Sequence, residues 1–247
     1  MIDVQTMIGL LIAVVAVIGG LLMEGGDPAS LVHGGAFVIV LGGTLAAILV
    51  QTPGRVFLKA LRMLPWVVRP PRADRRALVQ RIIGWSRIAR RDGLLALERQ
   101  AQGDSDGFAR SGLRMLVDGF DAVTLRNGLE TELTTHEDSG MQAARVFESA
   151  GGYAPTIGIL GAVLGLIQVM GGLDDPEQLG AGIATAFVAT VYGLVAANLV
   201  LLPVANKLKY HMREQVKEKE LLIEGLVGIA EAVNPRTLER QLNGHIE

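Results

Sequence analysis

The sequence predicts an all-α polytopic membrane protein with four transmembrane helices and a helical cytoplasmic domain. Half of its 247 residues are hydrophobic, the mean hydropathy is +0.38 and there are 31 glycines, a composition typical of membrane helices. Four segments reach the roughly 20 apolar residues that a spanning helix needs. They are Val4–Met23, Leu31–Val50, Tyr153–Leu173 and Leu179–Val204; the second contains His33, and the others contain no charged residue.

The basic residues predict how the chain is oriented. Residues 51–91 hold eleven Lys and Arg, whereas the connectors "EGGDPAS" and "DDPEQ" contain acids and neither Lys nor Arg. By the positive-inside rule, both termini lie in the cytoplasm and the two acidic connectors lie outside the cell. No basic segment precedes the first span, which argues against a cleaved signal peptide, so we expect all four spans to be retained.

We therefore expect four regions. Residues 1–52 form transmembrane helices 1 and 2, and residues 53–152 form the cytoplasmic helical domain. Residues 153–205 form transmembrane helices 3 and 4, and residues 206–247 form a cytoplasmic helical tail. In the tail, mixed charge with few helix breakers predicts that span four continues as a helix until "NPR" stops it near residue 233.

Charge divides the cytoplasmic domain. Residues 53–91 carry eleven basic residues and one acid, whereas residues 92–150 carry eleven acids and five arginines. This asymmetry fits a polarised surface for a protein partner, and it fits a solvated loop equally well. "QGDSDG" predicts a turn between helices.

Small residues recur at helical spacing in the spans. Span one has Gly9, Ala13, Ala16 and Gly20, span three has Gly158, Gly161 and Gly165, and span four has Gly182, Ala186, Thr190, Gly193 and Ala197. Such stripes let helix backbones approach closely in lipid. They predict close packing, either within one subunit or with another subunit or a partner helix.

The spans contain few polar residues and no carboxylate. An ion relay needs a group that changes charge, usually an Asp or Glu in the bundle interior. If this protein moves ions, another polypeptide must supply that carboxylate, and hydroxyls such as those of Thr185 and Thr190 line its path. Hydrogen bonding between helices explains Gln168 and Asn198 equally well.

Two prolines lie at the same depth, near the inner ends of spans three and four. Pro155 is expected in the first turn of span three, where proline is well tolerated. Pro203 interrupts a helix that continues into the tail, so it removes a backbone hydrogen bond and is expected to form a hinge.

Enzymatic activity is not expected. The chain has no Cys, no Ser, Asp or Glu lies inside a span, and "THED" lacks the spacing of a zinc-binding HExxH helix. We therefore expect no catalytic residue, no metal, no cofactor and no nucleic-acid partner.

Several blocks in order along the chain resemble the MotA/PomA family of flagellar stator subunits. They are "ARRDGLLALE", "GLRMLVDGFDA", "YAPTIGILGAVLGLI", "AFVATVYGL" and "LPVANKL". The resemblance implies an inner-membrane protein that forms an oligomeric ring, a pentamer around a partner dimer, in contact with membrane lipid. It also implies a MotB-type partner that supplies the ion-carrying Asp and anchors to peptidoglycan, and a cytoplasmic domain that pushes on the rotor protein FliG.

The block "ARRDGLLALE" has a physical explanation and an implied role. Gly93 is a natural helix C-cap, and Arg90 and Arg91 before it favour the negative end of the helix dipole. This explanation does not cover Glu98. By resemblance, Arg90 and Glu98 match the charged pair that engages FliG, with Arg91 as an auxiliary. Because Pro155 and Pro203 lie at one depth near the inner ends of spans three and four, we expect them to couple ion arrival to movement of the cytoplasmic domain.

The resemblance also concerns the ion. Sodium needs several oxygen ligands in place of its water. Sodium-driven PomA-type members have threonines at the positions that match Ala162 and Ala189, and here only Thr190 keeps a hydroxyl. The sequence therefore predicts a proton path with Thr190, Ala162, Thr185 and Ala189 along it. A TolQ/ExbB-type proton-channel energiser of an envelope transport system is the alternative, but its three-span layout and lack of "RRDGLLALE" disfavour it.

Overall fold

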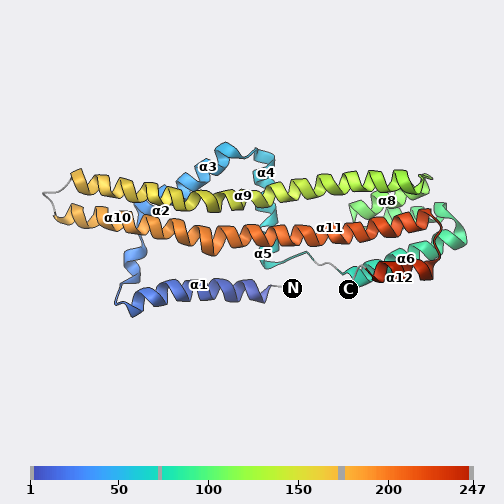
Figure 1. The fold of residues 1–247 in the computed structure, drawn as a ribbon, viewed down its shortest axis with the longest axis horizontal. Coiled ribbons are helices and arrows are strands. Elements are labelled where there is room, and N and C mark those ends of the chain that lie inside the picture. Colours follow the sequence, from blue (N-terminus) through green and yellow to red (C-terminus); the bar gives the residue numbers. More distant parts are fainter. Residues whose placement is uncertain (1–2, 72–73, 172–175, 245–247) are drawn as a thin grey trace. The chain divides into compact units, whose positions relative to one another are not determined.

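The computed structural model describes residues 3–71, 74–171 and 176–244, and every regular element in this part of the chain is helical. The helices form two compact units (Figure 1). Unit 1 comprises residues 1–70 and 140–211, and unit 2 comprises residues 71–139 and 212–247.

The described residues include four helices that are long and apolar enough to cross a membrane, which confirms the predicted span number. α1 has the predicted bounds, Val4–Met23, because the Asp3 side chain caps its first turn by accepting hydrogen bonds from the Gln5 and Thr6 amides. The second span starts later than predicted, at Gly34, since the 3₁₀ turn η1 (Pro28–Leu31) precedes it. This span consists of α2 (Gly34–Phe37), the π-helical η2 (Val38–Gly42) and α3 (Gly43–Gln51).

The third and fourth spans belong to helices that continue beyond the apolar segments. α9 runs without a break over Ala122–Gly171. α10 (Pro176–Val195) leads through the π-helical η4 (Ala196–Leu201) into α11 (Leu202–Ala230). The predicted region limits at 152 and 205 therefore fall inside helices, and as membrane boundaries they stay predictions.

The predicted position of Pro155 in a first helical turn is wrong. Pro155 lies in the interior of α9, because the helix already starts at Ala122. Proline cannot donate the amide hydrogen bond that the helix expects at this position. Spanning helices tolerate such a loss where neighbouring helices pack against the site, and α10 packs here: a Cβ on Gly193 would lie 3.1 Å from the Pro155 Cα. Pro203 is the second residue of α11, directly after η4, and the helix continues past it as predicted.

Small residues bring α9 and α10 into backbone contact within unit 1 (Figure 1). A Cβ on Gly158 would lie 2.9 Å from the Ala189 carbonyl oxygen, and one on Gly165 would lie 2.7 Å from that of Gly182. Packing within one subunit therefore explains the stripes of spans three and four. In α1 no residue is buried and the positions of Gly9 and Gly20 are open within the described chain, so the stripe of span one is unexplained.

Unit 1 also contains a core beside the short helices α4 (Gly54–Met63) and α5 (Pro65–Val68). It consists of Ile48, Ala60, Met63, Val67, Ala143, Ala144, Val146, Ala150 and Leu208. Asp3 ties the start of α1 to this region, since its carboxylate pairs with Lys207 and its amide donates to the Val68 carbonyl oxygen at 2.8 Å.

Unit 2 is a helical domain built from α6 to α8, α12, and the parts of α9 and α11 within its bounds. α6 (Arg75–Asp92) leads through η3 (Leu94–Leu97) into α7 (Glu98–Gly103), and α8 is Gly107–Val117. The predicted turn "QGDSDG" separates α7 from α8. The largest fully buried side chains of unit 2 are mostly aliphatic, and they include Ile82, Leu97, Leu113, Leu116, Leu129 and Leu226.

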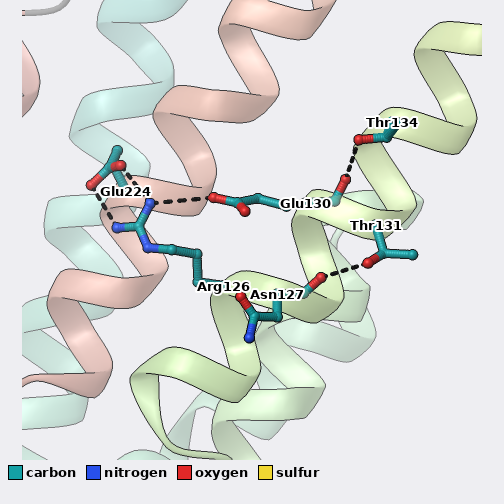
Figure 2. Close-up of polar contacts among 6 residues, drawn as sticks. All are labelled: Arg126, Asn127, Glu130, Thr131, Thr134 and Glu224. Atoms are coloured by element: carbon teal, nitrogen blue, oxygen red, sulfur yellow. Dashed lines mark hydrogen bonds and ion pairs between the residues drawn. The ribbon is translucent and has the colours of Figure 1, made fainter.

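Ion pairs inside unit 2 neutralise some of its basic and acidic side chains. Figure 2 shows Arg126 of α9 reaching both carboxylate oxygens of Glu224 on α11, at 2.7 and 3.0 Å, with Glu130 at 3.6 Å. Arg75 pairs with Glu214 at 2.6 Å and Arg81 with Asp104 at 2.7 Å. The basic stretch is therefore partly neutralised within its own domain.

The end of α11 differs from the prediction. The helix stops at Ala230, before "NPR", and Ala232 takes the left-handed conformation with φ of 55°. "NPR" starts a helix here: Asn234 accepts a hydrogen bond from the Arg236 amide, and Pro235 is the first residue of α12 (Pro235–Asn243). Both roles are common for "Asn-Pro", because proline fits the first helical turn as well as it ends a helix.

Candidate functional sites

The first candidate site is the charged connection between α6 and α7 in unit 2. α6 ends at Asp92, and Gly93 follows with φ of 84°, its amide donating to the Ala89 carbonyl oxygen at 2.9 Å. The predicted C-cap is thus confirmed. Since Gly93 takes a positive φ that disfavours side chains, it turns the chain sharply into η3.

The three predicted contact residues lie in or beside this connection along the chain, and all are exposed. Arg91 is held by Asp92 at 2.7 Å, and this hydrogen bond lowers the pKa of the Asp92 carboxyl. Glu98 begins α7 and accepts a hydrogen bond from the Gln102 amide group at 3.2 Å. Arg90 has no ion pair within the described residues, so its charge is available to a partner.

The second candidate site is in unit 1, along α9 and α10. Ala162 and Thr190 are half-buried, and the Thr190 hydroxyl donates to the Ala186 carbonyl oxygen at 3.2 Å. Ala189 is fully buried, and its Cβ would lie 2.7 Å from a Cβ added to Gly161. The Ala189 methyl group therefore faces the packing between α9 and α10 of its own chain.

Thr185 belongs to a hydrogen-bonded group that sequence reasoning did not find. Its buried hydroxyl lies 3.1 Å from Nε2 of His33, whose Nδ1 accepts from the Ala36 amide at 3.3 Å. The Tyr192 hydroxyl accepts from the His33 amide at 3.2 Å and donates to the Leu31 carbonyl oxygen. The presence of a histidine in an otherwise uncharged span was the signal for this group, which joins the start of the second span to α10.

The described residues contain no cluster of three or more His, Cys, Asp or Glu side chains that could hold a metal ion.

Comparison with known proteins identifies the family. Residues 7–91 match the motility protein A N-terminal family, and residues 100–221 match the MotA/TolQ/ExbB proton channel family. Motility protein A of Helicobacter pylori is 35% identical over 244 residues, covering 99% of this chain and 95% of that protein. The chain belongs to the motility protein A family. Motility protein A of Bacillus subtilis is also 35% identical, over 97% of this chain and 89% of that protein.

The fold agrees with solved structures of this family. The chain is similar to the structure of C. jejuni MotAB, with a TM-score of 0.92 and 33% identity over 99% of this chain and 96% of that one. As a member of this family, with four apolar helices of spanning length among its described residues, it is a multi-pass inner-membrane protein.

Proposed function

We propose that this protein is a flagellar motor stator subunit that, with a MotB-type partner, couples proton flow across the inner membrane to torque on the rotor protein FliG. Full-length similarity to motility protein A and to MotAB structures supports the stator function and an oligomer with a MotB-type partner. The ring is proposed to be a pentamer around a partner dimer, embedded in lipid, with both termini in the cytoplasm.

One observation supports the assignment of different roles in proton transfer to the two subunits. The four spans contain hydroxyls and backbone carbonyls but no carboxylate. A proton path needs a group that changes charge inside the membrane. The partner therefore supplies that group, and Thr190, half-buried on α10, is the hydroxyl of this chain proposed to lie beside it.

The cytoplasmic end of the mechanism is proposed for the connection between α6 and α7. The exposed Arg90, which forms no ion pair with any residue that the structure describes, and the exposed Glu98 carry opposite charges suited to a partner with complementary charges. Exposed ion pairs contribute roughly 0–1 kcal/mol each, so these contacts form and break readily. Such weak contacts suit a stator that steps along a rotor.

Liposome flux measurements test the proposal. The chain alone in liposomes is expected to conduct no protons, and the complex with its MotB-type partner is expected to conduct them. A partner whose transmembrane Asp is replaced by Asn is the matched control and should be silent. Proton flux through liposomes that contain only this chain would overturn the proposed division.

A further inference from the structure

A cleft of about 260 Å³ opens beside Arg90 in unit 2. The last turn of α6, the start of η3 and the residues that close α11 form its walls. Most of the side chains that line it are apolar, and Arg90 is the charged one; they include Ala89, Arg90, Leu94, Ile229, Ala232 and Val233.

One wall of the cleft is made by a residue in an unfavourable backbone conformation. Ala232 has φ of 55°, and it is the one non-glycine residue with positive φ in the described chain. Its amide donates to the Ile229 carbonyl oxygen at 3.0 Å, and the Val233 amide donates to that of Gly228 at 2.9 Å. Glycine would close a helix in this way without the steric penalty. An alanine here places a methyl group on the cleft at a conformational cost, as happens at functional sites.

The neighbouring leucines have divided roles. Leu97 is fully buried, Leu94 lines the cleft, and Leu95 is 74% exposed. Among the described residues of unit 2, the other exposed large apolar side chains are Phe120, in the connection from α8 to α9, and Val123, in the first turn of α9, and both are less exposed than Leu95. Leu95 thus adds exposed apolar surface next to the cleft, between Arg90 and Glu98 in the sequence.

The charges around the cleft indicate what kind of partner segment would bind there. Arg90 is exposed and has no ion pair in the described chain, whereas Asp92 neutralises the neighbouring Arg91. An apolar cleft with a free guanidinium at its rim fits an amphipathic helix that offers an apolar side chain next to a carboxylate. The apolar part of such a contact excludes water and supplies affinity, while the charges direct the approach.

We propose that the cleft lined by Ala89, Arg90, Leu94, Ala232 and Val233, here called the leucine cleft, receives an apolar side chain from an acidic helix of the rotor protein, and that the exposed Leu95, which follows Leu94 in η3, adds to this contact. This inference rests on the proposed function and adds a second component to the rotor contact. The affinity then has two contributions. The electrostatic contribution of Arg90 is screened by salt, whereas the apolar contribution of the cleft is not.

The test is the affinity of the purified stator complex for purified FliG, at low salt and at about 1 M salt, where the Debye length is about 3 Å. Ala89→Phe fills the cleft, and Ala77→Phe is its control at an exposed position of the same helix. Leu95→Ser removes exposed apolar surface without disturbing the core, and Val123→Ser is its control. Arg90→Glu reports on the charge.

Ala89→Phe and Leu95→Ser are expected to weaken binding at least about tenfold at both salt concentrations, with both controls unchanged. Arg90→Glu is expected to weaken binding mainly at low salt.

If Arg90→Glu weakens binding while Ala89→Phe and Leu95→Ser do not, the contact is purely electrostatic, and the cleft is refuted while the proposed function stands. A changed number of subunits in the Ala89→Phe complex would place a second copy in the cleft and overturn the inference. If wild-type protein does not bind FliG, the rotor contact and this inference both fall.

Discussion

Gly193 of α10 lies so close to Ala154 of α9 that a Cβ on Gly193 would come within 2.5 Å of the Ala154 carbonyl oxygen. The obstructing atom belongs to the backbone of a long helix, so it cannot rotate away as a side chain would. Gly158 and Gly165 meet backbone oxygens of α10 in the same way. Close approach of α9 and α10 therefore depends on the absence of side chains at these positions.

Gly193→Ala is expected to destabilise the protein by about 1–3 kcal/mol through overpacking, and Gly193→Val by more. Thermal unfolding of the detergent-purified protein measures the effect. Gly9→Val is the control, because a Cβ at Gly9 meets nothing within 4 Å in the described chain. Equal melting temperatures for Gly193→Val and wild type would show that the helices can separate at no cost.

The Arg126–Glu224 pair in unit 2 is expected to contribute little stability despite its two short hydrogen bonds. Its side chains are 35% and 43% exposed, and pairs this exposed contribute roughly 0–1 kcal/mol. Arg126→Glu should destabilise the protein, and adding Glu224→Arg should restore part of the loss. A double-mutant cycle measured by chemical denaturation gives the coupling, and a coupling well above about 1 kcal/mol would contradict the expectation.

Glu218 on α11 is expected to make stability depend on pH. Burial raises the pKa of its carboxyl above the ordinary 4.5, and the Asp106 carboxylate adds to the effect. A folded state with the higher pKa binds the proton more readily than the unfolded state. This contribution is therefore full below about pH 4.5 and is lost as pH rises through the folded pKa.

Glu218→Gln, which stays neutral, should accordingly melt above wild type at pH 7, and the difference should shrink as pH falls. Glu231→Gln, at an exposed position after the end of α11, is the control and should show no such trend. A Glu218→Gln protein that melts below wild type at pH 7 would mean that the ionised carboxylate is stabilising.

Pro203→Ala is expected to lower torque while leaving assembly intact. Pro203 lies two residues after the end of the π-helical η4, and both features loosen the regular hydrogen bonding of a helix. Alanine restores an amide donor and stiffens this point. Stall torque of tethered motors measures the effect at matched expression, and unchanged torque would reduce Pro203 to a packing role.

Swimming speed is expected to be independent of external sodium and to collapse under a protonophore. The positions of Ala162 and Ala189 lack hydroxyls, so few oxygen ligands remain for a sodium ion. Because Ala189 is buried against α9, Ala189→Thr alone is expected to disturb packing rather than create a sodium site. Speed that rises and saturates with sodium at constant membrane potential and pH would contradict the proton assignment.

The span number, the helical class and the family blocks followed from the sequence alone. A helix in lipid satisfies its own backbone hydrogen bonds, so a spanning helix can be recognised from the length and apolar character of its own segment. For the same local reason Gly93 could be assigned as a C-cap, and the charged residues Arg90 and Arg91 could be placed in the last turn of a helix.

The tertiary structure decided which partners these local features have. The sequence could not show that α9 continues through Pro155, since only packing against α10 offsets the lost hydrogen bond there. Nor could it show that Thr185 bonds His33, or that Ala232 turns left-handed beside Arg90 and forms a cleft with Leu94. These contacts join residues far apart along the chain, and their distances are fixed by how the helices pack rather than by the residues next to them.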